Sequence, residues 1–411
     1  MGQITVVRSE LKDLKEIPGW IIVYGRRKTG KTFLLKNFLK WDAYIYVRRD
    51  LSLRVDRLKT CDIRELPEAI GKILKSGGTA VIDEFQRLPH STLEDLTEYH
   101  PSGKLILSGS SFGVVKKIFE PSSPLLGFFT PYKLSLLNPV DLIVEFSKHY
   151  SPVKTIEAAS LLVDPWLIPL FKGDATKLIY EYACRYWHTV KALIGEVFAE
   201  EERTLTALYE ATLSLVGSGV WKPKDIASIL YTRGLVKEPS SSTIAGHLRN
   251  LIEMDLVEAI RIYRSKRKYY RLKSPIIECF YYLDDRYEVS EREVSYSEVK
   301  PTLEKLLRTQ IEKLAASFMA QLVGGRREYI LKPEVDFIVT VRGKPALIGE
   351  VKWGVYTKTD ITKFIDKTAS LPGKKVFIVR EKHAEHPDVT VIDPSNLVDL
   401  AKELHSKNTL Y

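Results

Sequence analysis

The sequence is poor in cysteine, with only Cys61, Cys184 and Cys279 in 411 residues. An odd, scattered set of this kind supports neither a disulfide framework nor a zinc site with closely spaced ligands. No apolar run approaches the roughly 18 residues of a membrane-spanning helix. The first residues lack the apolar core of a signal peptide, and position 6 is valine where a myristoylation site needs Ser or Thr. These absences predict a cytoplasmic protein without a membrane span.

Internal repeats and low-complexity segments are also absent, while 45% hydrophobic residues provide enough apolar side chains for folded cores. At this length we expect about three domains. The formal net charge of +10 is compatible with a nucleic-acid partner. A content of 28% charged residues would equally suit the Lys- and Glu-rich surface of a thermophilic protein, so the bulk charge does not decide between the two.

A glycine-rich string lies between an apolar run, Trp20–Tyr24, and a helical pattern that starts at Phe33. The string fits G-x-x-x-x-G-K-[ST], the loop that wraps nucleotide phosphates at the N-terminus of a helix. Lys31 would reach the β- and γ-phosphates of ATP, and the Thr32 hydroxyl would ligate Mg²⁺. The alternative is a Gly- and Lys-rich surface turn. The residues expected to contact nucleotide are Gly25, Arg26, Arg27, Lys28, Thr29, Gly30, Lys31 and Thr32.

Two later strand patterns end in polar residues that would complete this site. One apolar run ends in Asp83 and Glu84, about 50 residues after the loop. Asp83 would hold Mg²⁺ through water, and Glu84 would orient and deprotonate the attacking water. A further strand pattern ends in a Ser/Gly turn, where Ser108 or Ser110 would sense the γ-phosphate. The alternative for these serines is a plain turn.

The loop and its surroundings resemble the archaeal P-loop ATPases related to AAA and STAND proteins. The family usually places an arginine after the glycine at position 127, whereas this chain has Phe128. Because an arginine normally stabilises the charge on the transferred phosphoryl group, the resemblance implies slow hydrolysis unless Arg26, Arg27 or Arg87 substitutes. The segments that carry the resemblance are the loop itself, Arg8–Leu11, Val81–Gln86, Gly109–Ser111 and Ser123–Gly127.

Residues 216–290 have the pattern of a winged helix-turn-helix, with helices at Lys222–Leu230 and Ile244–Ile252 and a strand pair between Ile260 and Tyr270. We expect the second helix to present Thr243, His247 and Asn250 outward, with Arg249 beside them. The alternatives are a rigid spacer, a protein-docking module or a basic, soluble edge. Tyr263, Tyr269 and Tyr270 would face nucleic acid or belong to the core. The expected DNA-contacting residues are Thr243, His247, Arg249, Arg264, Lys266, Arg267 and Lys268.

The C-terminal segment contains Asp336 and, after thirteen intervening residues, Glu350 and Lys352 on a strand pattern. This Asp…Glu-x-Lys arrangement resembles the core of the PD-(D/E)xK nucleases, which often place a further carboxylate on a preceding helix, here Glu312. Asp336 and Glu350 would share Mg²⁺ with Glu312 nearby, and Lys352 would position water or stabilise the pentavalent phosphate. The alternative is a structural ion pair in a silent nuclease fold.

The resulting prediction is an α/β protein with a P-loop parallel-sheet ATPase lobe (1–148), a helical lid (149–215), a winged helix (216–290) and a small restriction-endonuclease-like domain (300–411). We expect a nucleotide-switched, slowly hydrolysing ATPase that uses ATP and Mg²⁺ and binds DNA, with a metal-dependent nuclease-like C-terminal domain. The runner-up is a regulatory ATPase switch whose winged helix and silent nuclease fold bind protein or DNA partners. The sequence leaves homo-oligomer formation open.

Overall fold

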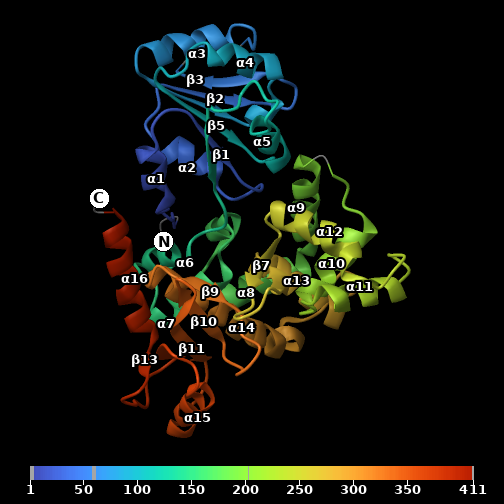
Figure 1. The fold of residues 1–411 in the computed structure, drawn as a ribbon, viewed down its shortest axis with the longest axis vertical. Coiled ribbons are helices and arrows are strands. Elements are labelled where there is room, and N and C mark those ends of the chain that lie inside the picture. The colour runs from blue at the N-terminus through green and yellow to red at the C-terminus, as the bar shows by residue number, and fades with distance from the viewer. Residues whose placement is uncertain (1–3, 58–61, 202, 410–411) are drawn as a thin grey trace.

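The computed structural model describes residues 4–57, 62–201 and 203–409, so that Cys61 and the first three residues lie outside the described chain. An N-terminal lobe lies at the top of Figure 1, and a helical region joins it to a second sheet at the bottom. A unit of helices lies to the right, and its short hairpin lies near the centre of the view. None of the helices in these described ranges is long and apolar enough to cross a membrane.

The N-terminal lobe contains a six-stranded sheet in the order β3-β2-β4-β5-β1-β6, parallel except for the edge strand β3. Side chains alternate between its two faces, so that Ile22 packs in one apolar cluster and Ile21 and Val23 in the other. The elements of this lobe are α1 (Glu10–Glu16), β1 (Ile21–Tyr24), α2 (Lys31–Phe38), β2 (Ala43–Val47), β3 (Leu53–Asp56), α3 (Leu66–Lys75), β4 (Thr79–Asp83), a 3-10 turn (Phe85–Arg87), α4 (His90–Thr97), β5 (Lys104–Gly109), α5 (Phe112–Ile118) and β6 (Thr130–Lys133).

The three strand patterns described for this lobe, at Trp20–Tyr24, before Asp83 and before the Ser/Gly turn, are present as β1, β4 and β5, which confirms the parallel α/β prediction. The two edge strands β3 and β6 were not expected. Each has only four residues, and β6 contains Pro131 and is largely exposed. A short polar edge strand lacks the apolar run that identifies a buried strand in the sequence.

The helical region follows the sheet, as expected, but its second half is more broken than the sequence suggested. A π-helical turn at Glu181–Arg185 interrupts the helix expected over Lys177–Leu193. The helix expected over Glu201–Val216 is α10, which begins only at Ala207. The elements of this region are α6 (Pro139–Ser147), α7 (Pro152–Leu161), a 3-10 segment (Pro165–Leu170), α8 (Ala175–Tyr180), the π-helical turn and α9 (Trp187–Glu200).

The helix–hairpin unit joins α10–α13 to the antiparallel β7–β8 hairpin. Helix α10 packs against α11, α13 and β8, so it belongs with this unit rather than with the preceding helical region. The elements are α10 (Ala207–Gly217), α11 (Pro223–Thr232), α12 (Ser241–Glu253), β7 (Val257–Arg261), β8 (Lys268–Leu272) and α13 (Pro275–Tyr287).

The C-terminal part contains a five-stranded sheet in the order β13-β12-β11-β10-β9. Strands β9, β10 and β11 are antiparallel neighbours, whereas β11, β12 and β13 run parallel. The elements are α14 (Tyr296–Leu322), β9 (Arg326–Glu328), β10 (Phe337–Val341), β11 (Lys344–Lys352), α15 (Lys358–Thr368), β12 (Lys374–Val379), β13 (Thr390–Ile392) and α16 (Pro394–Thr409).

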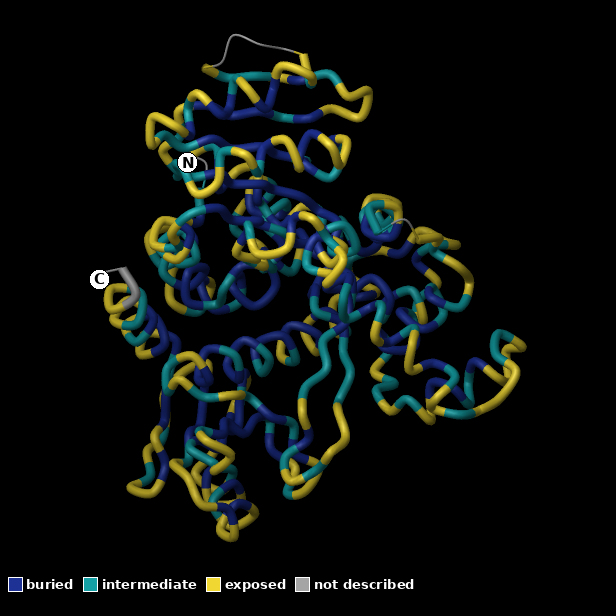
Figure 2. Tube along the Cα trace, turned by 45° about the horizontal axis from the view of Figure 1, so that its top comes forward, coloured by how far each residue is buried: buried dark blue, intermediate teal, exposed yellow. Residues whose placement is uncertain are grey.

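This second sheet shares its core with the helical region. Phe337 and Val339 of β10 point into a large apolar cluster that also contains residues of α6, α7 and α14, whereas Ile338 packs with α15 on the other face. Helix α16 packs on α6 and α7, and the buried Trp353 donates a hydrogen bond to Glu157 of α7 at 3.0 Å. Buried segments accordingly continue from the middle of the molecule into the lower sheet (Figure 2).

Candidate functional site

The glycine-rich loop connects β1 to α2, as the sequence predicts, and its two glycines have different structural reasons. A Cβ on Gly25 would come 1.9 Å from the Leu134 carbonyl oxygen, so only glycine permits this close approach to the end of β6. Gly30 caps α2 with φ 86°, a left-handed conformation that favours glycine. The backbone N–H groups of the first turn of α2 thereby face the space beside the loop, where an anion is favoured.

Lys31 is the first residue of α2, and its ammonium group points back along the loop. Its Nζ donates hydrogen bonds to the carbonyl oxygens of Gly25 at 2.7 Å and Arg26 at 3.0 Å. Burial lowers the pKa of Lys31 to about 8, and the nearby carboxylates of Glu84 and Asp83 oppose this shift. The lysine is thus a buried cation aimed at the position expected for the phosphates.

Three hydroxyl and carboxylate oxygens meet at the end of β4. Asp83 Oδ2 accepts hydrogen bonds from the Thr32 hydroxyl at 2.6 Å and from the Tyr44 hydroxyl at 2.7 Å. Oxygen donors of this kind are the ligands that Mg²⁺ prefers, so Thr32 and Asp83 fit the predicted metal site. Tyr44 was not expected at the site, because its position in the buried strand β2 marks it as a core residue.

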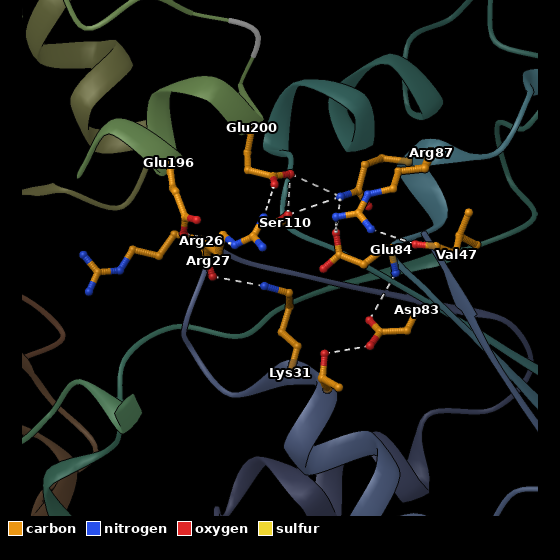
Figure 3. Close-up of polar contacts among 12 residues, drawn as sticks. Arg26, Arg27, Lys31, Val47, Asp83, Glu84, Arg87, Ser110, Glu196 and Glu200 are labelled. Atoms are coloured by element: carbon orange, nitrogen blue, oxygen red, sulfur yellow. Dashed lines mark hydrogen bonds and ion pairs between the residues drawn. The ribbon is translucent and has the colours of Figure 1, made fainter. Parts of the chain in front are cut away.

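Glu84 follows β4 with φ 61°, an uncommon backbone conformation for a non-glycine residue and one that recurs at functional sites. The carboxylate lies 2.7 Å from Arg87 Nη2 and accepts a hydrogen bond from Gln86 Nε2 at 3.0 Å (Figure 3). Burial raises the pKa of Glu84, against the opposing charge of Arg87. A carboxylate with a raised pKa at this position suits a general base.

Helix α9 brings Glu200 to the same place from the helical region. Its carboxylate accepts from Arg27 Nη1 at 2.5 Å, from the Ser110 hydroxyl at 2.7 Å and from Gln86 Nε2 at 3.3 Å (Figure 3). Glu196, one helical turn earlier, lies 3.2 Å from Arg27 Nε. Neither glutamate was predicted, because an acidic residue near the end of a helix ordinarily indicates a solvated face.

A cavity of about 560 Å³ opens beside the loop. Its lining combines polar groups that suit phosphates with apolar side chains that suit a base and sugar. The polar lining includes Arg27, Lys28, Thr29, Lys31, Thr32, Glu84 and Ser110, and the apolar lining includes Ile4, Val6, Phe33, Leu137, Pro165, Trp166 and Ile168.

The three arginines that were candidates to replace the family's arginine have different surroundings. Arg27 lines the cavity. Arg87 is engaged by Glu84 and by the Val47 carbonyl oxygen. Arg26 points away from the cavity into a buried ion pair with Asp164. Phe128, at the family's arginine position, packs against His100.

The two serines at the end of β5 are not equivalent. Ser110 lines the cavity, and its hydroxyl takes part in the Glu200 network. Ser108 is fully buried in the sheet between Val23 and Asp83, and its hydroxyl has no hydrogen-bond partner among the described residues. Ser110 is therefore the better placed of the two to contact a ligand.

Arg26 also connects the loop to more distant parts of the chain. Its ion-pair partner Asp164 is fully buried and accepts a hydrogen bond from the Ser274 hydroxyl at 2.7 Å. Ser274 is the N-cap of α13, where its oxygen accepts from the Ile277 N–H group. One chain of contacts thus leads from the nucleotide loop to the end of the β7–β8 hairpin.

The residues expected to contact DNA differ in accessibility. Arg249 on α12 is exposed, as are four basic residues of the hairpin, Arg264, Lys266, Arg267 and Lys268. The expectation that His247 and Asn250 face outward is wrong. Their partner is Tyr209 of α10, which lies 4.9 Å from the His247 ring and accepts a hydrogen bond from Asn250 Nδ2 at 2.6 Å. Thr243, one turn earlier, is half-buried.

The hairpin tyrosines have structural roles, the alternative that the sequence left open. Tyr269 stacks on Tyr329, the residue that follows β9, with ring centroids 4.1 Å apart. Tyr270 packs against the large shared core, and Tyr263 against the cluster on the other face of the C-terminal sheet. The Tyr263 N–H group also donates to the Tyr329 carbonyl oxygen at 2.7 Å. These contacts attach the hairpin to the C-terminal sheet.

The carboxylates of the C-terminal sheet lie at one end of β10 and β11. Asp336 accepts a hydrogen bond from the Val351 N–H group at 2.6 Å, and Glu350 is paired with Lys352 at 3.0 Å and with Lys367 of α15 at 2.8 Å. Burial and the charge of Glu350 raise the pKa of Asp336 to about 6. Burial and the charge of Asp336 raise the pKa of Glu312 to about 7.

This end of the sheet is therefore a coupled group of carboxylates and lysines. Burial alone would lower the pKa of Lys352, but the hydrogen bond and charge of Glu350 outweigh it and raise the pKa. Lys352 is thus a cation suited to stabilising negative charge rather than to removing a proton. Over residues 4–57, 62–201 and 203–409, no three His, Cys, Asp or Glu side chains converge as a ready metal site.

Comparison with known families identifies the N-terminal lobe. Residues 18–137 match the family model described as an AAA domain. The matched stretch contains the loop, Asp83 and Glu84. The lobe is a P-loop ATPase lobe. No curated protein matches the sequence.

The solved structures to which the chain is similar are remote from it in sequence and in fold. The Aeropyrum pernix ORC2 protein, in its ADPNP and ADP complexes, is 14% identical over 67% of this chain and 89% of its own, with a TM-score of 0.35. The A. pernix ORC1 protein in complex with DNA is 16% identical over 70% and 95%, with a TM-score of 0.27. Cdc6p from Pyrobaculum aerophilum is 15% identical over 74% and 91%, with a TM-score of 0.25. Scores this low establish no common arrangement of domains.

Proposed function

We propose that this protein is a Mg-ATP-dependent switch that hydrolyses ATP slowly and binds DNA. The observation that carries the proposal is the convergence of Lys31, Thr32, Asp83 and Glu84 beside the cavity, with a carboxylate of the helical region, Glu200, reaching into the same network. A bound nucleotide and the helical region would thus compete for the same side chains, above all for Arg27. That competition is the physical basis of a switch.

Each residue of the site has a role in this proposal. Lys31 binds the β- and γ-phosphates, and Thr32 and Asp83 hold Mg²⁺. The metal ion, when bound, supplies charge neutralisation on the phosphate oxygens. Glu84 takes the proton of the attacking water once it leaves Arg87. Arg27, which lines the cavity, is the arginine best placed to stabilise charge on the transferred group. Its engagement by Glu196 and Glu200 would slow turnover.

The switch would work through α9 and the loop. A triphosphate that recruits Arg27 removes the main cation from Glu200, and α9 loses one of its attachments to the loop. Arg26 adjoins Arg27 and pairs with Asp164, which is hydrogen-bonded to Ser274. Movement of the loop would therefore shift the base of the β7–β8 hairpin. Nucleotide state would thereby bias the position of the winged helix on DNA.

DNA binding is proposed for the basic hairpin and for Arg249 on α12. From Arg261 to Lys273 every formally charged residue is basic, and the exposed members have flexible side chains that suit phosphate contacts better than base recognition.

For the C-terminal sheet we propose a nuclease-like domain in which Asp336 and Glu350 hold Mg²⁺ near Glu312, with Lys352 stabilising the scissile phosphate. The second candidate is a silent nuclease fold, and the two lysines that pair with Glu350 favour it. Metal-dependent cleavage of plasmid, single-stranded or branched DNA distinguishes the two. Cleavage that disappears in Glu350→Gln and Lys352→Ala supports the nuclease, whereas no cleavage of any of these substrates supports the silent fold.

The nucleotide site is tested with Lys31→Ala. We expect a loss of at least about 100-fold in ATP affinity, because the buried cation that meets the phosphates is removed. Lys75→Ala, at an exposed lysine of α3 that does not line the cavity, is the control and should bind ATP normally. If Lys31→Ala bound ATP as tightly as the wild type, the site assignment would be wrong.

A further inference from the structure

The attachment of the hairpin to the C-terminal sheet creates a surface that neither part has alone. The Tyr329 N–H group donates to the Arg261 carbonyl oxygen at 2.9 Å, and Tyr263 donates back to Tyr329 at 2.7 Å. Together with the Tyr269–Tyr329 stack, these contacts hold β7–β8 against β9. Basic side chains of the hairpin therefore lie next to basic side chains of β9 and of the β10–β11 turn.

Two adjoining hollows follow this junction, with volumes of about 480 and 560 Å³. Arg261 of the hairpin and Arg326 of β9 line both of them. Lys344, at the start of β11, lines the first, and Lys266 and Lys268 line the second. We call this continuous surface the hairpin–sheet groove.

The groove is strongly basic even after its carboxylates are counted. Seven basic side chains and two carboxylates line it. Both carboxylates are already neutralised, since Glu258 pairs with Arg271 and Arg327, and Glu328 pairs with Arg326 at 2.7 Å. Five further basic side chains of the groove have no carboxylate of the described chain within ion-pair distance. They are Arg261, Arg264, Lys266, Lys268 and Lys344.

We propose that the hairpin–sheet groove binds the phosphate backbone of double-stranded DNA across both the hairpin and the C-terminal sheet. The proposal rests on the DNA binding proposed above and extends it to two residues outside the winged helix, Arg326 and Lys344. Five cations without a carboxylate partner, spread over two adjoining hollows, match a polymer with a negative charge about every 1.7 Å better than they match a single phosphate.

The groove is separate from Asp336 and Glu350 at the other end of β10 and β11. Lys344 opens β11 and Glu350 lies six residues later on it, so about 20 Å of strand separates them. DNA held in the groove would join the winged helix to the C-terminal sheet in one complex.

The test measures binding of a fluorescently labelled 30-base-pair duplex of mixed sequence by anisotropy, at several salt concentrations, for three double variants of the full chain. Arg326→Gln/Lys344→Gln removes two charges from the sheet side, and glutamine at 326 retains a hydrogen-bond donor for Glu328. Lys266→Gln/Lys268→Gln removes two from the hairpin. Lys402→Gln/Lys407→Gln, on the exposed side of α16, is the matched control.

We expect both groove variants to weaken binding by about tenfold or more at 0.1 M salt and to reduce the slope of log affinity against log salt by about 2, with no change in the control. If only the hairpin variant loses affinity, the winged helix still binds DNA and the extension to the sheet is wrong. If the wild type binds no duplex, the DNA-binding function and the groove both fail. Unchanged ATP binding and thermal unfolding in each variant confirm that the fold is intact.

Discussion

Glu200 Oε1 accepts a hydrogen bond from Arg27 Nη1 at 2.5 Å, a contact between residues 173 positions apart. Burial alone would raise the pKa of Glu200, but the hydrogen bond from Ser110 and the charge of Arg27 outweigh it and lower the pKa. Glu200 is therefore a carboxylate ion beside the place proposed for the phosphates. It neutralises the arginine that those phosphates would use.

The Glu200→Gln variant should bind ATP more tightly. The substitution removes a negative charge near the incoming phosphates and releases Arg27, while the amide can still bond Ser110. We expect an increase of about tenfold, equivalent to about 1.4 kcal/mol. Titration with a fluorescent ATP analogue measures it, and Glu238→Gln, an exposed glutamate of the helix–hairpin unit, is the control. Equal or weaker binding in Glu200→Gln would show that this carboxylate does not compete with nucleotide.

The Glu84→Gln variant should separate binding from hydrolysis. Glutamine can still interact with Gln86 but cannot accept a proton from water, so we expect turnover to fall by about 100-fold or more with ATP affinity nearly unchanged. Phosphate release under single-turnover conditions is the measurement, with and without duplex DNA. Glu94→Gln on α4 serves as the surface control. Normal turnover in Glu84→Gln would require a different base.

The nucleotide loop was predictable from sequence because its chemistry is local. Eight consecutive residues, with a strand before and a helix after, specify one backbone path, and Asp83 is recognisable at the end of a later buried strand. Glu200 was not predictable in the same way. Nothing in the sequence of the helix that carries Glu196 and Glu200 indicates that both meet an arginine on another element, because that pairing depends on how the helical region packs against the sheet.

The buried pair of Arg26 and Asp164 should dominate the stability of the connection between loop and hairpin. Asp164→Asn leaves a buried guanidinium without its counter-charge, and we expect a loss of about 3–5 kcal/mol in the free energy of unfolding. Ser274→Ala removes one hydrogen bond and a helix cap, at about 1–2 kcal/mol. Urea unfolding measures both.

A double variant separates charge from packing at this position. Arg26→Met/Asp164→Leu replaces both charges by apolar groups and should regain most of the stability lost in Asp164→Asn. If Asp164→Asn were no less stable than Ser274→Ala, the ion pair would contribute little. The nucleotide dependence of DNA binding, measured on Ser274→Ala, tests whether the same contacts carry the switch.

In the C-terminal sheet, the strands were predictable from the sequence, but the contacts between separate elements were not. Strand periodicity located β10 and β11 and put Asp336, Glu350 and Lys352 at one end of them. The pairing of Glu350 with Lys367 was not foreseeable, since Lys367 lies on a separate helix and resembles any other surface lysine. Likewise, the alternation of tyrosines in the hairpin did not reveal that Tyr269 stacks on Tyr329, because that contact joins two different sheets.

Divalent ions should bind the C-terminal carboxylates more weakly in acid. A metal ion binds the deprotonated carboxylates, and the raised pKa values of Glu312, about 7, and Asp336, about 6, mean that both take up protons between pH 8 and pH 5.5. Mn²⁺ affinity, measured calorimetrically without nucleotide, is therefore expected to fall as the pH is lowered through this range.

The ion bound at the C-terminal sheet can be told apart from any ion at the nucleotide loop by substitution. Glu350→Gln should abolish the pH-dependent binding of Mn²⁺, because the substitution removes a proposed ligand and the partner of two lysines. Glu312→Gln should weaken Mn²⁺ binding and lower the pH at which half of it is lost. Glu304→Gln, exposed on the same helix α14, is the matched control and should leave it intact. If the wild type bound no Mn²⁺ at this sheet at pH 8 but bound DNA normally, the sheet would be the silent fold, in which Lys352 and Lys367 take the place of the metal ion beside Glu350.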